Sequence, residues 1–398
     1  MVLSNSLVLG LDVFLANSQK YTKSWGRCAL LCNHSSINKD LRDCFNLMRD
    51  VLGDRLTCVF SPQHGFYGTE QDNMRETKHA FDLENKIQIY SLYSETRQPS
   101  ALMLEKLDTL IIDLAVVGCR IYTYKATMKA CLQACKEYGK RVVVLDRPNP
   151  LGGVRVAGLC PDADRLSFVA PDIMPMQHGL SAAEAALFFN QKIKADLEVI
   201  KMDNWQVDEL LSPRPWAYTS PNLPTLESIF VYPGTVLLEG TNISEGRGTS
   251  LPFQLVGAPY LKSARSYRKL VQDHYGPLEG AFLREVEFVP TFGKWEGVLC
   301  HGVHIMLTNP ARLKAFRLGV CLIAAAMEIG QDNFAWKSPP YEYEYETLPM
   351  EVIFGAKDFY DHIKAPHYDE AYFSRGINEY IDRSKEILLY PRKQILFS

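Results

Sequence analysis

The chain has 398 residues, of which 47% are hydrophobic and 22% charged, so it has the composition of a globular protein and the length of two packed domains. Its formal net charge of −3 gives no general attraction to nucleic acid or anionic lipid, and no basic stripe is present. Several of the 10 cysteines stand in apolar or helical runs, which favours buried, reduced thiols over a disulfide scaffold or a metal site.

The apolar run near the N-terminus, residues 7–15, resembles an export signal only superficially. No basic residue precedes it and Asp12 interrupts it, so we interpret it as the first folded segment. No stretch approaches the roughly 18 apolar residues of a membrane span. We therefore expect a cytoplasmic protein with no membrane association.

The first half alternates short apolar runs with helical patterns. Two of these runs, Thr109–Leu114 and Arg141–Asp146, are apolar on both faces, as strands of a covered parallel sheet must be. The other predicted strands are Cys28–Cys32, Leu56–Ser61, Ile87–Leu92 and Leu197–Met202. Helices are predicted over Thr123–Tyr138 and from the capping box Ser181–Glu184 to about Asn190. This order predicts a Rossmann-like, doubly wound α/β domain over residues 1–205.

The second half, residues 206–398, is less regular and predicts a smaller α+β domain that closes a cleft. Glu285–Pro290 and Val303–Thr308 alternate like half-exposed strands, and Leu313–Ile329 has the pattern of a long helix. The segment Tyr341–Glu346 alternates aromatic and acidic residues, which predicts an edge strand or an extended surface segment.

Polar clusters follow three of the predicted strands. They begin at Ser61, Val117 and Asp146, and the first is followed by a further polar run from Gln71 to Glu76. In an open parallel sheet, ligands bind beyond the carboxyl ends of the strands. The sequence therefore predicts that these loops converge on one cleft.

A fourth cluster, Glu239–Thr249, belongs to the second half. Three glycines surround Asn242, Glu245 and Arg247, and they allow close approach of the backbone to a ligand. Arg247 is a candidate to clamp a carboxylate with two hydrogen bonds.

Structural readings of the same residues remain open. Asp146 fits a plain turn equally well, and Asp113 fits a buried structural acid. His64 and His178 each precede a glycine and are consistent with turn residues. Only the clustering of these segments favours a site.

Seven segments, taken together and in order, resemble the exo-β-N-acetylmuramidase family, long known as a domain of unknown function. The segments are Ser61–Phe66, Tyr90–Pro99, Arg120–Tyr124, Asp146–Pro150, Gln177–Gly179, Tyr232–Gly234 and Glu239–Thr249. The resemblance implies a Rossmann-like domain with a smaller C-terminal domain, and an active site between them. It also implies release of N-acetylmuramic acid from the non-reducing ends of peptidoglycan fragments, without a metal or nucleotide. The substrate-binding residues expected from these segments are Gln63, Asn73, Arg120, Tyr122, Asp146, Arg147, Asn149, His178, Asn242 and Arg247.

One position departs from the family's pattern, which has a glutamate where this chain has Gln63. The chain is similar to a branch that carries this glutamine together with residues 71–74 and Glu76. An amide cannot act as general acid or base. The candidates for that role are Glu245 first, then Glu76 with His64 as a proton carrier, and also Glu70 and Asp72. Assistance by the 2-acetamido group of the substrate, oriented by Gln63 or Asn73, is a further hypothesis.

Two rival functions remain open at this stage. The first rival is a non-catalytic protein that binds an amino sugar or muropeptide, having kept the cleft and lost the acid. Alternatively, the chain hydrolyses a glycoside of another N-acetylated amino sugar, with a different partner for Arg247.

Overall fold

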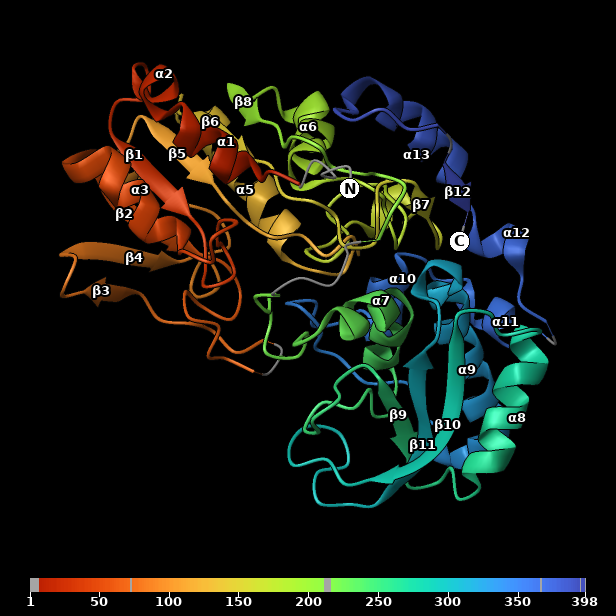
Figure 1. The fold of residues 1–398 in the computed structure, drawn as a ribbon. Helices are drawn as coiled ribbons and strands as arrows, with labels where there is room; N and C mark the ends of the chain where they lie inside the picture. The colour runs from red at the N-terminus through yellow and green to blue at the C-terminus, as the bar shows by residue number, and fades with distance from the viewer. Residues whose placement is uncertain (1–6, 72–73, 211–215, 366, 394, 398) are drawn as a thin grey trace, which may run out of the picture.

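A computed structural model describes residues 7–71, 74–210, 216–365, 367–393 and 395–397. It shows two packed halves, each with its own sheet (Figure 1). The first half carries a seven-stranded sheet and the second a three-stranded one.

The large sheet has the strand order β3-β4-β2-β1-β5-β6-β8. Its strands are β1 (Cys28–Leu31), β2 (Leu56–Ser61), β3 (Ala80–Asp82), β4 (Ile87–Ser91), β5 (Thr109–Ile112), β6 (Arg141–Leu145) and β8 (Leu197–Ile200). All neighbours pair in parallel except β3, which runs antiparallel to β4 at the edge. The predicted Rossmann-like architecture is confirmed.

Helices cover both faces of this sheet because alternate strand residues point to opposite sides. On one side Leu30 and Val59 pack with Phe14 of α1 (Gly10–Ala16) and Met48 of α3 (Cys44–Leu52). On the other side Leu31 packs in the core that contains α5 (Tyr124–Glu137) and α6 (Ala182–Ile193). Two shorter helices, α2 (Ser18–Thr22) and α4 (Ala101–Leu104), complete this half.

The second half is built on an antiparallel sheet in the order β10-β11-β9. Its strands are β9 (Leu255–Ala258), β10 (Ala281–Phe288) and β11 (Cys300–Leu307), and its long helices are α7 (Leu226–Thr235), α8 (Ala264–Tyr275) and α9 (Ala315–Gly330). Short helices follow: α10 (Pro349–Phe354), α11 (Phe359–Ile363), α12 (Glu370–Phe373) and α13 (Ile377–Ser384).

Short 3-10 turns occur in both halves of the described chain. The first half contains η1 (Gly53–Arg55) and η2 (Ala163–Arg165). The second half contains η3 (Val236–Gly240), η4 (Pro310–Arg312), η5 (Gln331–Asn333) and η6 (Lys385–Ile387).

The end of the chain returns to the first half. Strand β12 (Leu396–Phe397) pairs in parallel with β7 (Arg155–Val156). Arg392 binds Glu184 of the predicted capping box at 2.6 Å between Nη2 and Oε2, and the box itself is present at the start of α6. The last residues of the second half therefore pack against the first half.

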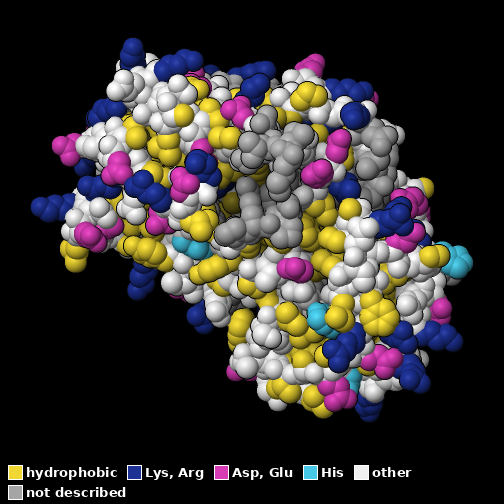
Figure 2. All heavy atoms as spheres, viewed as in Figure 1, with side chains coloured by type: hydrophobic (Ala, Val, Ile, Leu, Met, Phe, Trp, Pro, Cys, Tyr) yellow, Lys and Arg dark blue, Asp and Glu magenta, His cyan; other side chains and the backbone are white. Residues whose placement is uncertain are grey.

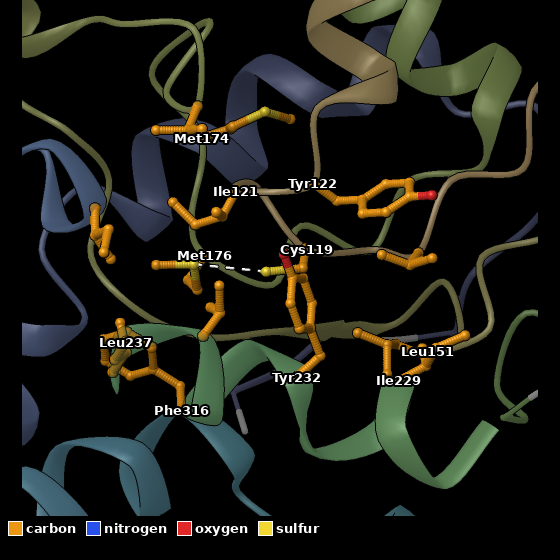
Figure 3. Close-up of a cluster of buried hydrophobic side chains, with 14 of the residues drawn as sticks. Cys119, Ile121, Tyr122, Leu151, Met174, Met176, Ile229, Tyr232, Leu237 and Phe316 are labelled. Carbon is orange, nitrogen blue, oxygen red and sulfur yellow. Dashed lines mark hydrogen bonds between the residues drawn. The ribbon is translucent and has the colours of Figure 1, made fainter. Parts of the chain in front are cut away.

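One continuous apolar core joins the two halves. Tyr232 of α7 and Leu237 of η3 point from the second half toward the first-half segments that carry Cys119 and Met176 (Figure 3). The Sγ and Sδ atoms of these two residues lie 3.6 Å apart. Such an apolar interface fixes the position of one half relative to the other, and it therefore determines the shape of any cavity between them.

All 10 cysteines are free and buried, as the sequence predicts. On the face shown in Figure 2, outside the grey atoms, basic and acidic side chains are interspersed. Within the described residues, no helix has the length and apolar character required to cross a membrane.

Candidate active site

A small cavity between the two halves has a volume of about 30 Å³, within about 370 Å³ of space between atoms that is partly open to solvent. It receives residues from the loops after β2 and β5, from the turn of Ser220, from α7 and η3, and from two segments further along the chain. Its lining consists of Gln63, His64, Ile121, Tyr122, Thr123, Ser220, Leu223, Tyr232, Glu239, Arg247, Phe253, Tyr341 and Glu342. The loop after β2 and the Glu239–Thr249 segment, which the sequence predicts to share a cleft, both line this cavity.

The loop after β2 places Gln63 and His64 in the wall. The Gln63 carbonyl oxygen Oε1 accepts a hydrogen bond from the Thr123 hydroxyl at 2.5 Å. Nδ1 of His64 lies 2.6 Å from the carbonyl oxygen of Glu70, so this nitrogen carries the proton, and Nε2 accepts from the Ser220 hydroxyl at 3.1 Å. Burial lowers the pKa of His64 to about 4. The imidazole is therefore neutral at pH 7, so His64 is not a charged proton donor.

The loop between β5 and α5 supplies Tyr122 and Thr123. The Tyr122 hydroxyl donates to the backbone carbonyl of Thr219 at 3.0 Å, and the Tyr124 hydroxyl donates to the same oxygen at 2.6 Å. These bonds fix the segment that carries Ser220 against the first half. The hydroxyl groups of Tyr122, Thr123 and Tyr124 in this wall all have hydrogen-bond partners.

The second half contributes a buried charge network. Arg247 Nη2 lies 2.6 Å from Glu239 Oε1, and its Nη1 lies 3.0 Å from Glu245 Oε1. Lys294 Nζ lies 2.8 Å from the other oxygen of Glu245. Burial raises the pKa of Glu245, but the charges of Lys294 and Arg247 outweigh it and hold the pKa at about 2. Glu245 is thus an ionised anchor for Arg247, and it does not line the cavity.

The segment predicted as an edge strand is instead a tight turn, Tyr341–Glu344, that brings Tyr341 and Glu342 into the cavity. The Tyr341 hydroxyl donates to Glu239 Oε2 at 2.7 Å, and the Tyr93 hydroxyl donates to Glu342 Oε2 at 2.7 Å. Both acids are about 4% exposed. The prediction of an edge strand or an extended surface segment was wrong here because alternation of aromatic and acidic residues does not show which of them find buried partners.

Two profiles of known proteins match most of the chain. Exo-beta-N-acetylmuramidase NamZ, N-terminal, matches residues 28–227, and exo-beta-N-acetylmuramidase NamZ, C-terminal, matches residues 230–390. The chain belongs to the NamZ family. The peptidoglycan beta-N-acetylmuramidase NamZ of Bacillus subtilis (strain 168) is 38% identical over 333 residues, which cover 83% of this chain and 79% of that protein.

Two crystal structures share the fold of this NamZ family member. Both are DUF1343 family proteins from Bacteroides fragilis NCTC 9343. One has a TM-score of 0.84 at 23% identity and covers 97% of this chain and 99% of its own. The other has a TM-score of 0.72 at 25% identity and covers 98% of this chain and 100% of its own.

Three residues expected to bind substrate in this NamZ homologue have structural partners and lie outside the cavity lining. Arg120 is fully buried, and its guanidinium donates to the carbonyls of Leu159 and Met174 in the first half and of Ile353 and Phe354 at the end of α10. Asp146 accepts hydrogen bonds from the Ser181 and Tyr390 hydroxyls and from the Ala183 backbone. Arg147 pairs with Asp113, at 2.7 Å between Nη2 and Oδ2, and borders a different cavity.

Three further candidates also make hydrogen bonds with protein groups outside the cavity lining. Asn149 Oδ1 accepts from the Leu151 N–H at 2.9 Å, and His178 Nδ1 accepts from the Leu180 N–H at 3.1 Å. Asn242 donates to the Asn333 carbonyl at 2.8 Å and accepts from the Tyr260 hydroxyl at 2.9 Å. Each bond is local turn chemistry or a loop contact, so these side chains support the fold around the cavity.

The acidic candidates after β2 lie outside the cavity or outside the described residues. Asp72, together with the substrate-binding candidate Asn73, lies outside the described residues. Glu70 pairs weakly with Arg75 at 4.0 Å. Glu76 lies 3.6 Å from Arg97, and 55% of its side chain is exposed. No group of three or more His, Cys, Asp or Glu residues in the described part of the chain is arranged to hold a metal ion.

Replacing Glu76 with glutamine is expected to change little. An exposed ion pair of this length contributes about 0–1 kcal/mol, and the side chain does not line the cavity. The Glu76→Gln variant should keep kcat/KM within about twofold of wild type on a chromogenic muramic acid glycoside, since surface substitutions seldom alter a remote site. A tenfold loss would return Glu76 to the list of catalytic residues.

Proposed function

We propose that this protein is an active exo-β-N-acetylmuramidase, which hydrolyses the glycosidic bond of a terminal N-acetylmuramic acid in peptidoglycan fragments. The proposal takes the reaction from the muramidase of Bacillus subtilis, to which the chain is 38% identical. Activity is proposed although residue 63 is a glutamine, because the carboxyl groups of Glu239 and Glu342 line the same cavity.

The observation that carries the proposal is the cavity itself. It is shaped by both halves, and it contains two buried glutamates in different environments, Glu239 and Glu342. Glycoside hydrolysis commonly uses two carboxyl groups, one to protonate the leaving oxygen and one to act at the anomeric carbon. With glutamine at position 63, the cavity thus still contains two carboxyl groups for the reaction.

Arg247 has a different role in this proposal from that of a free carboxylate clamp. Its guanidinium binds Glu239 and Glu245, and it also lines the cavity. It holds the Glu239 carboxyl group in place beside the proposed sugar site. The lactyl carboxylate of the substrate, if it approaches Arg247, shares this guanidinium with two protein carboxylates.

The test is turnover of 4-nitrophenyl β-glycosides of N-acetylmuramic acid and N-acetylglucosamine by the purified protein. We expect release of nitrophenol from the muramic acid glycoside and little from the other. Saturable binding of N-acetylmuramic acid without product, measured by calorimetry, would favour a non-catalytic binder. Faster turnover of the N-acetylglucosamine glycoside would assign the cavity to another amino sugar.

A further inference from the structure

The turn Tyr341–Glu344 has a backbone that its residues rarely adopt. The Tyr341 N–H donates to the Glu344 carbonyl at 3.0 Å, and the Glu344 N–H donates to the Tyr341 carbonyl at 2.9 Å. Between them, Glu342 has φ of 44° and Tyr343 has φ of 71°. Glycine or asparagine usually occupies such positions. A strained backbone of this kind persists where surrounding contacts hold it, and it clusters at functional sites.

Contacts from both halves hold this turn in place. Tyr341 is fixed to Glu239 of η3, and Glu342 is fixed to Tyr93 of the first half. The Tyr343 ring lies under the Arg97 guanidinium, with 3.6 Å between Cζ and the ring centroid. The turn is thus anchored on three sides, and the carboxyl of Glu342 is held in the cavity beside Gln63 and His64.

The surroundings of Glu342 favour its protonated form. Burial raises the pKa of Glu342 to about 7, and the negative charge of Glu239 acts in the same direction. Hydrogen bonds from Tyr93 and Gln63 and the charge of Arg247 oppose this shift only in part. Glu239, by contrast, has one oxygen on Arg247 and the other on Tyr341. Of these two carboxyl groups, Glu342 is therefore the one whose surroundings suit a proton donor.

We propose that Glu342 is the general acid of the hydrolysis, a role that rests on the proposed function. The O–H bond of the Glu342 carboxyl breaks, and its proton goes to the glycosidic oxygen. The bond from this oxygen to the anomeric carbon breaks, and its electron pair stays with the oxygen. Water adds its hydroxyl to the anomeric carbon, and the remaining proton of that water restores Glu342. The net change is one water consumed for each glycosidic bond cleaved.

The other candidate acids are less suited to this step. Glu245 is ionised between Lys294 and Arg247, and Glu76 is exposed beside Arg97. His64 is neutral and engaged at both ring nitrogens. Among the carboxyl groups that line the cavity in the described part of the chain, Glu342 is the one without an ion-pair partner at 4.0 Å or less. Gln63 then positions the Glu342 carboxyl through a hydrogen bond and is not itself the acid.

The experiment compares Glu342→Gln with wild type on two substrates. A disaccharide in which N-acetylmuramic acid is linked to N-acetylglucosamine has a poor leaving group that needs a proton. The 4-nitrophenyl glycoside has a good leaving group that hardly needs one. We expect kcat for the disaccharide to fall about 10²–10⁴-fold, the usual contribution of a general acid, and kcat for the nitrophenyl glycoside to fall far less. The matched control, Glu346→Gln, changes an exposed glutamate of the same segment and should leave both rates unchanged.

The pH profile gives a second, independent readout. Wild-type kcat on the disaccharide should decline as the pH rises above about 7, because Glu342 loses its proton there. The Tyr93→Phe variant removes a hydrogen bond that stabilises the carboxylate, so this decline should move to higher pH. A purely structural role of Tyr93 would lower activity without moving the decline.

Three results would overturn the assignment. Equal losses on both substrates in Glu342→Gln, with a folded protein by circular dichroism, would show that Glu342 does not protonate the leaving group. An unchanged rate on the disaccharide would do the same. A wild-type protein that cleaves neither substrate would contradict the proposed function itself, and the role of Glu342 with it.

Discussion

Replacing Gly234 with alanine is expected to destabilise the protein by about 3 kcal/mol, the upper end of what overpacking usually costs. Helices α7 and α9 approach so closely that a Cβ on Gly234 would lie 1.8 Å from the Ala315 carbonyl oxygen. A Cβ on Gly319 would lie 2.2 Å from the Gly234 carbonyl oxygen. No side-chain rotation relieves a clash with backbone, so the two helices must separate.

The same substitution is expected to reduce activity, because α7 carries Tyr232 and leads directly into η3, which carries Glu239. Urea unfolding followed by circular dichroism measures the loss of stability. The control is Gly139→Ala, where a Cβ meets nothing within 4 Å and the residue has φ of 64°, so only about 1–2 kcal/mol of backbone strain is expected. If Gly234→Ala is no more harmful than this control, the helices are not in backbone contact.

Replacing Arg247 with methionine is expected to cost about 3–5 kcal/mol of stability, the range for breaking a buried ion pair. The change leaves Glu239 without its cation and leaves Glu245 with Lys294 alone. Turnover of the muramic acid glycoside should also fall by at least tenfold, since Glu239 loses the contact that fixes it. The control is Arg42→Met, which removes an exposed pair with Asp50 and should cost about 0–1 kcal/mol.

The stability lost in Arg247→Met should depend on pH. In the wild type the pKa of Glu245 is lowered to about 2, so the stabilisation from this group is complete above its usual pKa of 4.5 and is lost as the pH falls toward 2. Without Arg247, the pKa of Glu245 rises, and the folded variant takes up protons at higher pH. The difference in unfolding free energy between the two proteins should therefore shrink as the pH falls from about 4.5 toward 2. A constant difference over this range would mean that the guanidinium acts through packing and not through charge.

Much of the fold follows from local patterns in the sequence. The strands β5 and β6 were predicted because residues apolar on both faces fit only a sheet covered on both sides, which is what the helices provide. The start of α6 was predicted from Ser181 and Glu184, whose side chains cap the helix whatever lies around it. Such signals depend on residues within a few positions of one another.

The sequence predicts those cavity-lining residues that lie in polar loops at the ends of strands, and it does not predict the others. Gln63, His64 and Tyr122 were found by that rule. Asp146 and Arg147 satisfy the same rule, yet they bind Ser181, Tyr390 and Asp113. Position at a strand end does not distinguish a side chain that faces a ligand from one that caps a helix or pairs with a buried acid.

Glu342 was beyond local analysis. Its partner Tyr93 is 249 residues away in the chain, and its turn has positive φ without glycine or asparagine. The predicted edge strand or extended surface segment would leave its acidic side chains in water, whereas the fold buries Glu342. Only the packing of the two halves determines which of the glutamates in the segment is buried.

The most direct measurement is a crystal structure of the Glu342→Gln protein with a disaccharide in which N-acetylmuramic acid is linked to N-acetylglucosamine. The muramic acid ring should lie between Gln63 and Glu239, with its glycosidic oxygen at hydrogen-bond distance, about 3 Å, from the side chain at position 342. A sugar bound outside this cavity, for example in the one beside Arg147, would contradict the assignment of the active site.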